Sequence, residues 1–396
     1  MKTMSKLITG DKRIWFVVFV LFMYSFFLAY SAGTEHTLSD NGIQIKMLIM
    51  KNLRIFLGGI LVMYAAHLIN IKKLMRLSFL RFALQIMIVL LGLVLVQDNG
   101  YAAKRWLVLF GFSFQPSTLA IPIMMFYIST YCAKYYDKPL EFYESVRALW
   151  SYIVIITVLI GLQNLSTAIL FVLLSFILLF IGGYPFKHYM RIVSIFAVLM
   201  GGFLFVLMTA PDILPTDRAV TWKNRIETYL NPESASKDAT HQISLSKLAV
   251  ARGGILGKGP GNSLVKNKIS QGTSDFAYAI LVEEFGILLG GILILFAYLY
   301  LGYLIFVNCF QAKTIYKQLL IVGLGIPIVL QAILNMGVAT GLLPVTGQPL
   351  PFISDGGTGT LVNCVSIGLV IGMSRDRMKT KKAKITKQEL SKIKFV

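Results

Sequence analysis

The chain has 396 residues, of which 56% are hydrophobic and 14% charged, and its 38 Lys and Arg residues against 18 Asp and Glu residues give a formal net charge of +20. A soluble chain of this length would carry about a quarter charged residues, so the composition excludes a set of water-exposed globular domains. The 3 Cys and 4 His residues show no spacing typical of a disulfide framework or a metal cluster. Excess positive charge in a membrane protein anchors cytoplasmic loops more often than it binds nucleic acid.

Apolar segments long enough to cross a hydrocarbon core of about 30 Å recur along the chain. The first follows Lys12-Arg13 and has no small-residue cleavage site after it, so we expect it to be retained as a span rather than removed as a signal peptide. The sequence predicts an all-α polytopic membrane protein whose transmembrane domain covers residues 1–374. Its ten transmembrane helices are expected at about 14–32, 48–69, 80–97, 117–135, 146–163, 166–183, 190–210, 276–305, 318–338 and 360–374.

Lysine and arginine residues are distributed unevenly between the two sides of this bundle. The segments on the side of residue 1 hold 24 of them, whereas the short segments on the opposite side hold 3. Because Lys and Arg accumulate on cytoplasmic segments, we expect both termini in the cytoplasm. Residues 375–396 then form a basic cytoplasmic tail, which either contacts anionic lipid headgroups or acts as a solvated topology anchor.

A large extracytoplasmic loop is predicted at 211–275, between the seventh and eighth helices. Connections this long are usually functional or disordered. The loop contains Trp222, Tyr229 and an apolar stretch at 245–256, so amphipathic helices at the membrane surface are expected within it.

Basic residues gather at two places on the outer side. Lys104 and Arg105 precede the aromatic Trp106, and they either contact a phosphate or carboxylate group of a lipid or anchor their loop at the headgroup level. The second place is a glycine-rich segment, 253–263, with one cation and two small polar side chains, Lys258, Asn262 and Ser263. Glycines let backbone N–H groups approach an anion closely, but a glycine-rich turn without a ligand is an equal alternative.

Three carboxylates surround the predicted start of the eighth helix. Asp275 lies at its N-terminus, where the helix dipole favours an anion, so it is either an N-cap or a functional group. Glu283 and Glu284 lie about 12–14 Å deeper, where an ionised carboxylate is costly. At least one of them should face a polar cavity or a basic partner, and two successive helical residues cannot point the same way.

The last outer loop, 341–359, is rich in glycine and proline but too apolar to lie in water. Non-helical backbone at membrane depth is tolerated only where protein buries it or where it lines a cavity. We therefore predict a structured re-entrant loop bordering the site, with Thr346, Ser354 and Asp355 among its polar side chains.

These motifs together resemble the SEDS family of bacterial cell-wall proteins (FtsW, RodA and SpoVE), and their sequences look closest to those of FtsW-type members. The most specific match is Gly341 to Gly357, which is similar to the family's G-L-L-P-V-T-G-x-x-L-P-F-I-S-Y-G-G signature. Further matches follow in the family's order: Lys104-Arg105-Trp106-Leu107, Gln115-Pro116-Ser117, Leu230-Asn231-Pro232, Gly257 to Ser263, Asp275-Phe276 and Glu283-Glu284-Phe285-Gly286.

The resemblance implies a peptidoglycan glycosyltransferase of the bacterial cytoplasmic membrane. Such an enzyme polymerises lipid II, the undecaprenyl-diphosphate-linked disaccharide, at the outer membrane surface with inversion, beside a class B penicillin-binding protein and other division or elongation machinery. Asp275 matches the family's essential aspartate and is the expected general base. Candidates to stabilise the leaving diphosphate are Arg105, Lys258 and Lys266, or a bound divalent cation; no other cofactor is expected. The full set of expected substrate-binding residues is Lys104, Arg105, Lys258, Asn262, Ser263, Lys266, Glu283, Glu284, Thr346, Ser354 and Asp355.

Several positions depart from the family pattern. An intramembrane Glu–Lys pair expected in the central cavity is replaced by Thr118 and Ile121, a Gln-Pro-Asp motif reads Gln163-Asn164-Leu165, and the Tyr of the final signature is Asp355. Loss of both members of an ion pair strands neither charge, so a divergent enzyme is still expected. Two other functions compete with it: a flippase or transporter of undecaprenyl-linked precursors, and a non-catalytic scaffold for the penicillin-binding protein.

Overall fold

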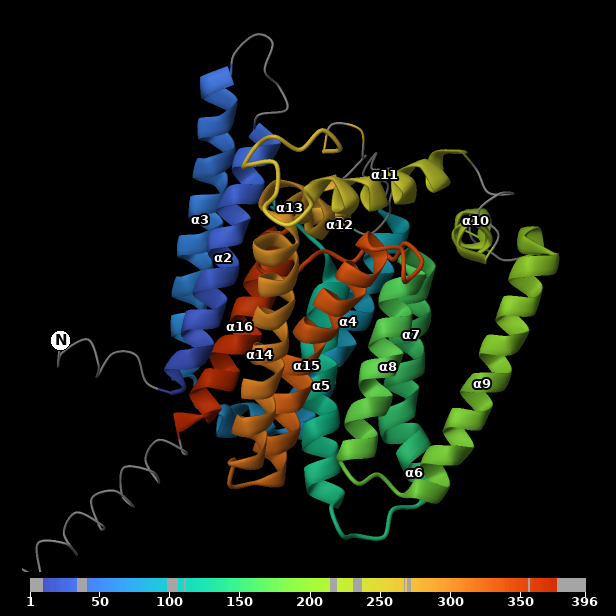
Figure 1. Cartoon of the computed structure of the whole chain (residues 1–396). Helices are drawn as coiled ribbons and strands as arrows, with labels where there is room; N and C mark the ends of the chain where they lie inside the picture. Colours follow the sequence, from blue (N-terminus) through green and yellow to red (C-terminus); the bar gives the residue numbers. More distant parts are fainter. Residues whose placement is uncertain are drawn as a thin grey trace, which may run out of the picture.

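The computed structural model describes residues 10–33, 41–97, 106–109, 112–213, 219–230, 237–266, 268, 272–354 and 357–375. Long helices run side by side in a bundle, and short helices lie across one end of it (Figure 1). The first half contains α2 (Lys12–Gly33), α3 (Asn41–Leu68), the 3-10 helix η2 (Ile71–Met75), α4 (Leu77–Val96), strands β1 (Leu107–Leu109) and β2 (Phe112–Phe114), α5 (Pro116–Tyr135), α6 (Phe142–Ser145), the π-helical η3 (Val146–Trp150), α7 (Ser151–Gln163) and α8 (Leu165–Ile181).

The second half begins with α9, which stands apart from the other long helices in Figure 1. Its elements are α9 (Phe186–Thr209), the 3-10 helix η4 (Pro211–Ile213), α10 (Ala219–Leu230), α11 (Lys237–Gly253), α12 (Gly272–Asp275), α13 (Ala277–Gly286), the π-helical η5 (Ile287–Ile292), α14 (Leu293–Phe310), α15 (Ile315–Ala339) and α16 (Gly357–Met373).

Helical segments occur at all ten predicted spans, and in the described residues seven of them are long and apolar enough to cross a membrane. Helices α8 and α16 are shorter, and α5 has Pro122 in its interior. The prediction of an all-α polytopic membrane protein is therefore confirmed, whereas the count of ten spans stays a prediction. One small hairpin was not expected: β1 pairs antiparallel with β2, which sets Leu107 opposite Phe114.

The core of the bundle is built around α15, the most buried of the long apolar helices, which packs against α5, α14 and α16. Beside it, α3 and α16 approach each other closely through two glycines of α16. A Cβ on Gly368 would lie 2.4 Å from the backbone oxygen of Met63, and one on Gly372 would lie 2.7 Å from that of His67. Small residues allow this kind of contact between transmembrane helices.

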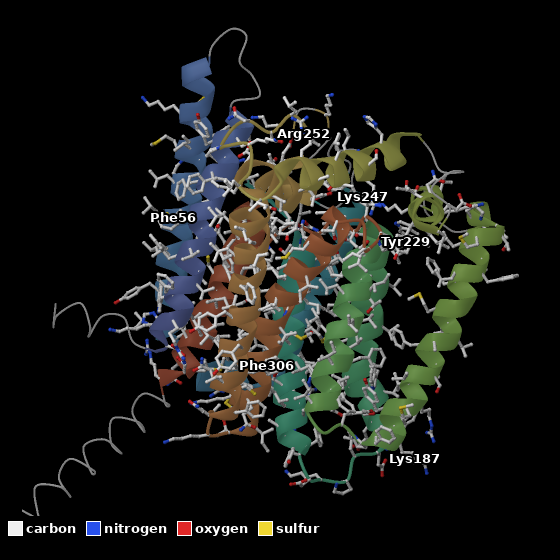
Figure 2. The ribbon with its side chains drawn as sticks, in the orientation of Figure 1. Phe56, Lys187, Tyr229, Lys247, Arg252 and Phe306 are labelled. Carbon is white, nitrogen blue, oxygen red and sulfur yellow. The ribbon has the colours of Figure 1, made fainter. Side chains whose placement is uncertain are left out.

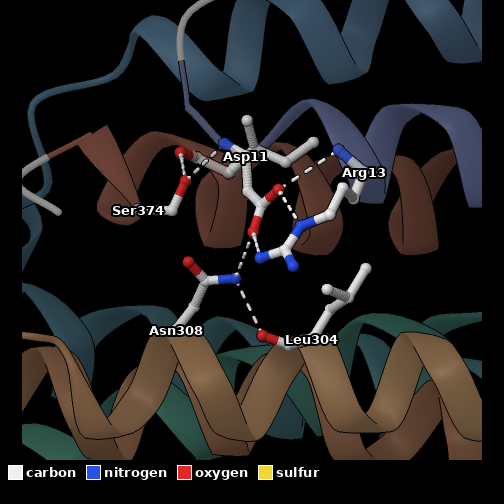
Figure 3. A network of polar contacts seen from close by, with 6 residues as sticks. Asp11, Arg13, Leu304, Asn308 and Ser374 are labelled. Carbon is white, nitrogen blue, oxygen red and sulfur yellow. Dashed lines mark hydrogen bonds and ion pairs between the residues drawn. The ribbon is translucent and has the colours of Figure 1, made fainter. Parts of the chain in front are cut away.

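A buried polar cluster ties three helix ends together (Figure 3). It lies where α2 starts, at the end of the bundle away from α11 (Figure 1). The Asp11 carboxylate accepts hydrogen bonds from the Arg13 guanidinium, at 3.0 and 2.8 Å, and from Asn308 Nδ2 at 3.2 Å. The Asp11 N–H donates to Ser374 Oγ at 2.9 Å. The start of α2 is thereby joined to α14 and to the end of α16.

The long predicted loop contains two helices of 12 and 17 residues, α10 and α11, and helices within this loop were expected from the sequence. Helix α11 lies across the end of the bundle and packs on α13 (Figure 1). Trp222 of α10 packs against Phe203 of α9, with ring centroids 6.1 Å apart. Helix α10 thus packs on α9 and helix α11 on α13, whereas the domain limits and the side of the membrane remain predictions.

Candidate functional site

Asp275 is the last residue of α12 and is partly exposed. The N-cap position of α13 is Phe276, one residue later, so Asp275 does not occupy the capping position that the sequence offered as the alternative. Ser274 Oγ donates to Asp275 Oδ1 at 3.0 Å. A Cβ on Gly347, whose φ is +66°, would lie 3.5 Å from Asp275 Oδ2. The carboxylate therefore faces the backbone of the proline-rich loop.

A cavity of about 1090 Å³, including its mouth, opens beside Asp275 between α5, α15, α16 and this loop. Asp275 is the only ionisable side chain among the described residues that line it. Thr118 and Ile121, where the family usually has Glu and Lys, both line this cavity. The remaining polar lining consists of amides, hydroxyls and an indole: Trp106, Gln115, Asn164, Thr167, Ser274, Gln331, Gln348, Ser354, Thr358, Thr360, Asn363 and Ser366.

The unexpected hairpin has a role at this cavity. Because Leu107 pairs with Phe114, the flanking residues Trp106 and Gln115 are brought close together, and both line the cavity. Asn164 also lines it while its side chain caps α8, accepting from the N–H groups of Ser166 at 3.1 Å and Thr167 at 3.4 Å. The departure from the family pattern at Asn164 is thus compatible with a well-formed start of α8.

The last loop is structured and lines the cavity, as expected, whereas its re-entrant position in the membrane stays a prediction. Residues 344–350 are irregular and are followed by a turn, and Leu350, Phe352 and Ile353 are each 1% exposed. Ser354 Oγ donates to the backbone oxygen of Ser274 at 2.8 Å and accepts from Leu350 N–H at 2.9 Å. Of the predicted loop residues, Ser354 therefore reaches the peptide next to Asp275, whereas Thr346 does not line the cavity.

One buried polar residue that contacts the site was not expected from the sequence. Asn335 of α15 is 1% exposed, and its Nδ2 donates to the backbone oxygens of Asp275 at 2.9 Å and Gln348 at 2.8 Å. An amide inside an apolar helix of membrane-spanning length is itself a signal, because a buried polar group requires partners. The sequence could not show that its partners lie 60 and 13 positions away.

Neighbouring helices hold the start of the loop from outside. The Tyr229 hydroxyl of α10 donates to the backbone oxygen of Leu342 at 3.1 Å. A Cβ on Gly341 would lie 2.1 Å from the side chain of Lys247 of α11, so glycine leaves room for that lysine. Figure 2 shows Tyr229, Lys247 and Arg252 at the same end of the bundle.

The glycine-rich segment 253–263 wraps around the C-terminal end of α13. Its backbone N–H groups at Lys258 and Gly259 donate to the backbone oxygens of Glu283 and Glu284, at 3.0 and 2.9 Å. A Cβ on Gly257, whose φ is +84°, would lie 2.2 Å from the Glu284 oxygen. The glycines thus allow two backbones to touch, which supports the turn rather than an anion-binding loop.

The two glutamates of α13 point apart, as predicted. Glu283 is fully buried and accepts from Ser263 Oγ and from Leu264 N–H at 3.3 Å, and its Oε1 lies 3.4 Å from Arg252 Nε. Glu284 accepts instead from the hydroxyl of Ser31 on α2. Both carboxylates hold the loop and α2 against α13, and neither lines the cavity beside Asp275.

Four predicted binding residues lie together, but in a separate depression. Lys258, Asn262, Ser263 and Lys266 line it with Arg252, Gly261 and Leu264. Lys258 and Asn262 are exposed. Lys266 is 6% exposed, and its ammonium donates to the backbone oxygens of Ser31 and Gly261, both at 2.8 Å. The structure therefore brings these four residues to one another and not into the Asp275 cavity.

Three predicted residues, Lys104, Arg105 and Asp355, lie outside the described residues, as do Asn231-Pro232 and the tail from 376 onward. Across the part of the chain that the structure describes, no group of three or more His, Cys, Asp or Glu side chains is arranged to hold a metal ion.

The geometry defines a multi-pass helical membrane protein with a cavity lined by amides and hydroxyls, in which Asp275 is the one carboxylate among the described lining residues. The model of the FtsW/RodA/SpoVE family, described as cell cycle proteins, matches residues 11–379. The chain belongs to this family, and the resemblance found in its motifs is confirmed.

Similar proteins cover most of the chain. The probable peptidoglycan glycosyltransferase FtsW of Enterococcus hirae is 30% identical over 310 residues, covering 77% of this chain and 76% of the relative. That of Borreliella burgdorferi is 34% identical over 281 residues, covering 69% and 72%.

Two solved structures show the same fold. A chain from a structure on the coordination of polymerization and crosslinking by a peptidoglycan synthase complex has a TM-score of 0.70 at 22% identity, covering 93% of this chain and 98% of the other. RodA of Thermus thermophilus has a TM-score of 0.62 at 21% identity, covering 93% and 97%.

Proposed function

We propose that this protein is a peptidoglycan glycosyltransferase that polymerises lipid II at the outer face of the bacterial cytoplasmic membrane. The observation that carries the proposal is Asp275, which among the described residues is the only ionisable side chain at a cavity lined by amides and hydroxyls, in a chain of the FtsW/RodA/SpoVE family. Amide and hydroxyl side chains are suited to hydrogen bond the hydroxyl and acetamido groups of a sugar. The proposal includes ten spans with both termini in the cytoplasm.

Asp275 acts in this proposal as the general base. It takes the proton from the 4-hydroxyl of the acceptor sugar while that oxygen attacks the anomeric carbon of the donor, and the lipid diphosphate leaves from the opposite face, which inverts the configuration. General-base catalysis contributes about 10²–10⁴-fold, so positive charge near the leaving diphosphate has to supply further stabilisation.

The depression lined by Arg252, Lys258 and Lys266, which we call the cationic depression, is the proposed source of that charge, from a position separate from the Asp275 cavity. Lys258 is exposed and free to turn toward a diphosphate, whereas Lys266 is committed to two backbone oxygens and acts through its charge alone. Arg105, or a divalent cation, is the other candidate. A class B penicillin-binding protein is the proposed partner that crosslinks the product, beside other division or elongation machinery.

The test is polymerisation of purified lipid II by the protein with its cognate penicillin-binding protein, with and without a chelator. Asp275→Asn removes the base without changing the shape of the side chain. Asp137→Asn is the matched control, because Asp137 lies in an exposed turn at φ 55°, a conformation that Asn also adopts.

We expect glycan strands from the native chain and from Asp137→Asn, and none from Asp275→Asn. Equal strand formation by all three would remove Asp275 from the reaction. No strands from any of them, beside an active related enzyme, would favour the flippase or the scaffold. Loss of strands on chelation alone would assign the leaving-group role to a divalent cation.

A further inference from the structure

Asn335 joins two segments that meet at the site. Its single amide nitrogen contacts the backbone oxygen of Asp275 at 2.9 Å and that of Gln348 at 2.8 Å. Gln348 is in turn fixed to α8, because its Nε2 donates to Thr167 Oγ1 at 2.8 Å. A continuous chain of hydrogen bonds therefore runs from α8 through the loop and α15 to the main chain of Asp275.

The orientation of the Asn335 amide follows from its partners. Two carbonyl oxygens can only accept, so the group between them must be the NH₂, which has two hydrogens to give. The bond to Gln348 is closed off from water, since Asn335 is 1% and Gln348 is 5% exposed, whereas the bond to the partly exposed Asp275 is half-buried. A side chain of the same size without a donor would leave the buried Gln348 oxygen unsatisfied and would release the Asp275 oxygen.

The main chain at Asp275 is also held by a side chain of the 341–359 loop. Ser354 Oγ donates to the backbone oxygen of Ser274, so the carbonyls of two successive residues, Ser274 and Asp275, are fixed by side chains from two different elements. Fixing both carbonyls sets the peptide planes on each side of the Asp275 Cα. The direction of the Asp275 Cα–Cβ bond is thereby determined, and the hydrogen bond from Ser274 Oγ to Oδ1 holds the carboxylate at its end.

We propose that Asn335 is a positioning residue of the active site, which aims the Asp275 carboxylate into the cavity without touching substrate. Ser354 assists from the opposite side, so its role is to orient Asp275 rather than to bind substrate. The inference rests on the proposed function of Asp275 as the general base. Catalytic groups must be held to about 0.5 Å, and a misplacement of 1 Å costs about 10²-fold in rate.

The experiment compares Asn335→Leu with Asn308→Leu in the polymerisation assay of the full chain with its partner. Asn308 is a close match: it is 2% exposed, and its Nδ2 also donates twice, to Asp11 Oδ2 and to the Leu304 oxygen. It lies near the C-terminal end of α14, at the far end of the helical segment Ala277–Phe310 that follows Asp275. Ser354→Ala is a milder second variant, which keeps the test decisive where Asn335→Leu does not fold.

We expect both leucine variants to unfold more readily than the native chain. Only Asn335→Leu should lose kcat, by about 10–100-fold, with KM for lipid II unchanged, because positioning acts on the transition state. Ser354→Ala should show a smaller loss of the same kind. Asn335→Gln, which keeps the NH₂ group, should recover part of the kcat.

Three results would overturn the inference. Folded Asn335→Leu with native kcat would make Asn335 a structural residue only. A raised KM at native kcat, in Asn335→Leu or Ser354→Ala, would mean that these residues bind substrate instead. An Asp275→Asn variant as active as the native chain would show that Asp275 is not the general base, and the inference about Asn335 would fall with it. If the native chain is active and Asp275→Asn is not, the base role stands, and the Asn335 variants test the positioning role alone.

Discussion

The ion pair between Arg252 and Glu283 allows an asymmetric prediction. Glu283 is fully buried, whereas the Arg252 side chain is 34% exposed. Arg252→Met strands a carboxylate that cannot reach water, while Glu283→Gln leaves a guanidinium that can turn outward. Although the two changes break the same contact, we expect Arg252→Met to be the more destabilising one.

The magnitudes follow from the remaining contacts of Glu283. Removing one partner of a buried pair costs about 3–5 kcal/mol. Here the cost is reduced to about 1–3 kcal/mol, because Ser263 and Leu264 still donate to the carboxylate and the exposed part of Arg252 was already screened by solvent. Glu283→Gln should cost about 1 kcal/mol, the value of a typical net hydrogen bond.

Apparent unfolding temperatures of the purified single and double variants, in one detergent, check this reasoning. Arg252→Met with Glu283→Gln should be more stable than Arg252→Met alone, since the stranded charge is gone. Equal losses from the two single variants, or a double variant whose loss is their sum, would refute the argument that burial of Glu283 determines the cost. Lys223→Met is a control, because in its contact with Glu227, at 3.8 Å, both side chains are partly exposed, so that no charge is stranded away from water.

Three further predictions concern the glycine turn, the start of α8 and the Asp11 cluster. Gly257→Ala should prevent the turn from closing on α13, because its Cβ would lie 2.2 Å from a backbone oxygen; limited proteolysis of the 253–263 segment measures this. Asn164→Ala should lower stability by about 1 kcal/mol through loss of the N-cap, and Asn164→Asp should not, as thermal unfolding can show. Burial raises the pKa of Asp11, but the hydrogen bonds from Arg13 and Asn308 together lower it by more than burial raises it. The pKa of Asp11 therefore lies below the ordinary 3.8. The Asp11 contribution to stability is therefore present above pH 3.8 and is lost as the pH falls through the lowered pKa, and Asp11→Asn should remove that part of the acid sensitivity in an unfolding series.

The sequence predicted the long helices because an apolar run of membrane-spanning length admits few other structures. It was least accurate where helix and apolar run do not coincide. Helix α3 begins at Asn41, about seven residues before the expected limit, because Lys46 and Lys51 interrupt the apolar pattern without interrupting the helix. The hairpin at 107–114 was missed because its two strands have three residues each and no Asn-Gly or Asp-Gly pair joins them.

The candidate site was predictable residue by residue but not as an arrangement. The position of Asp275 before an apolar helix could be read directly, and so could the opposite directions of Glu283 and Glu284. What the sequence could not provide was the separation of the cationic depression from the Asp275 cavity, since this depends on how the 253–263 turn folds back on α13. The role of Asn335 likewise depends on contacts between segments far apart in the chain.

The contact between the 253–257 turn and the end of α13 limits how this protein can change over time. Gly257 faces the Glu284 oxygen, and Gly286 faces the Ile255 oxygen at 2.3 Å from its would-be Cβ. Because each glycine meets main chain, no second substitution across the contact can make room for a larger side chain, as a smaller neighbour does in an ordinary core. Replacement of these glycines during evolution therefore cannot be compensated by a second substitution. An engineer redesigning the surface around Arg252 and Lys258 would have to keep this backbone contact fixed.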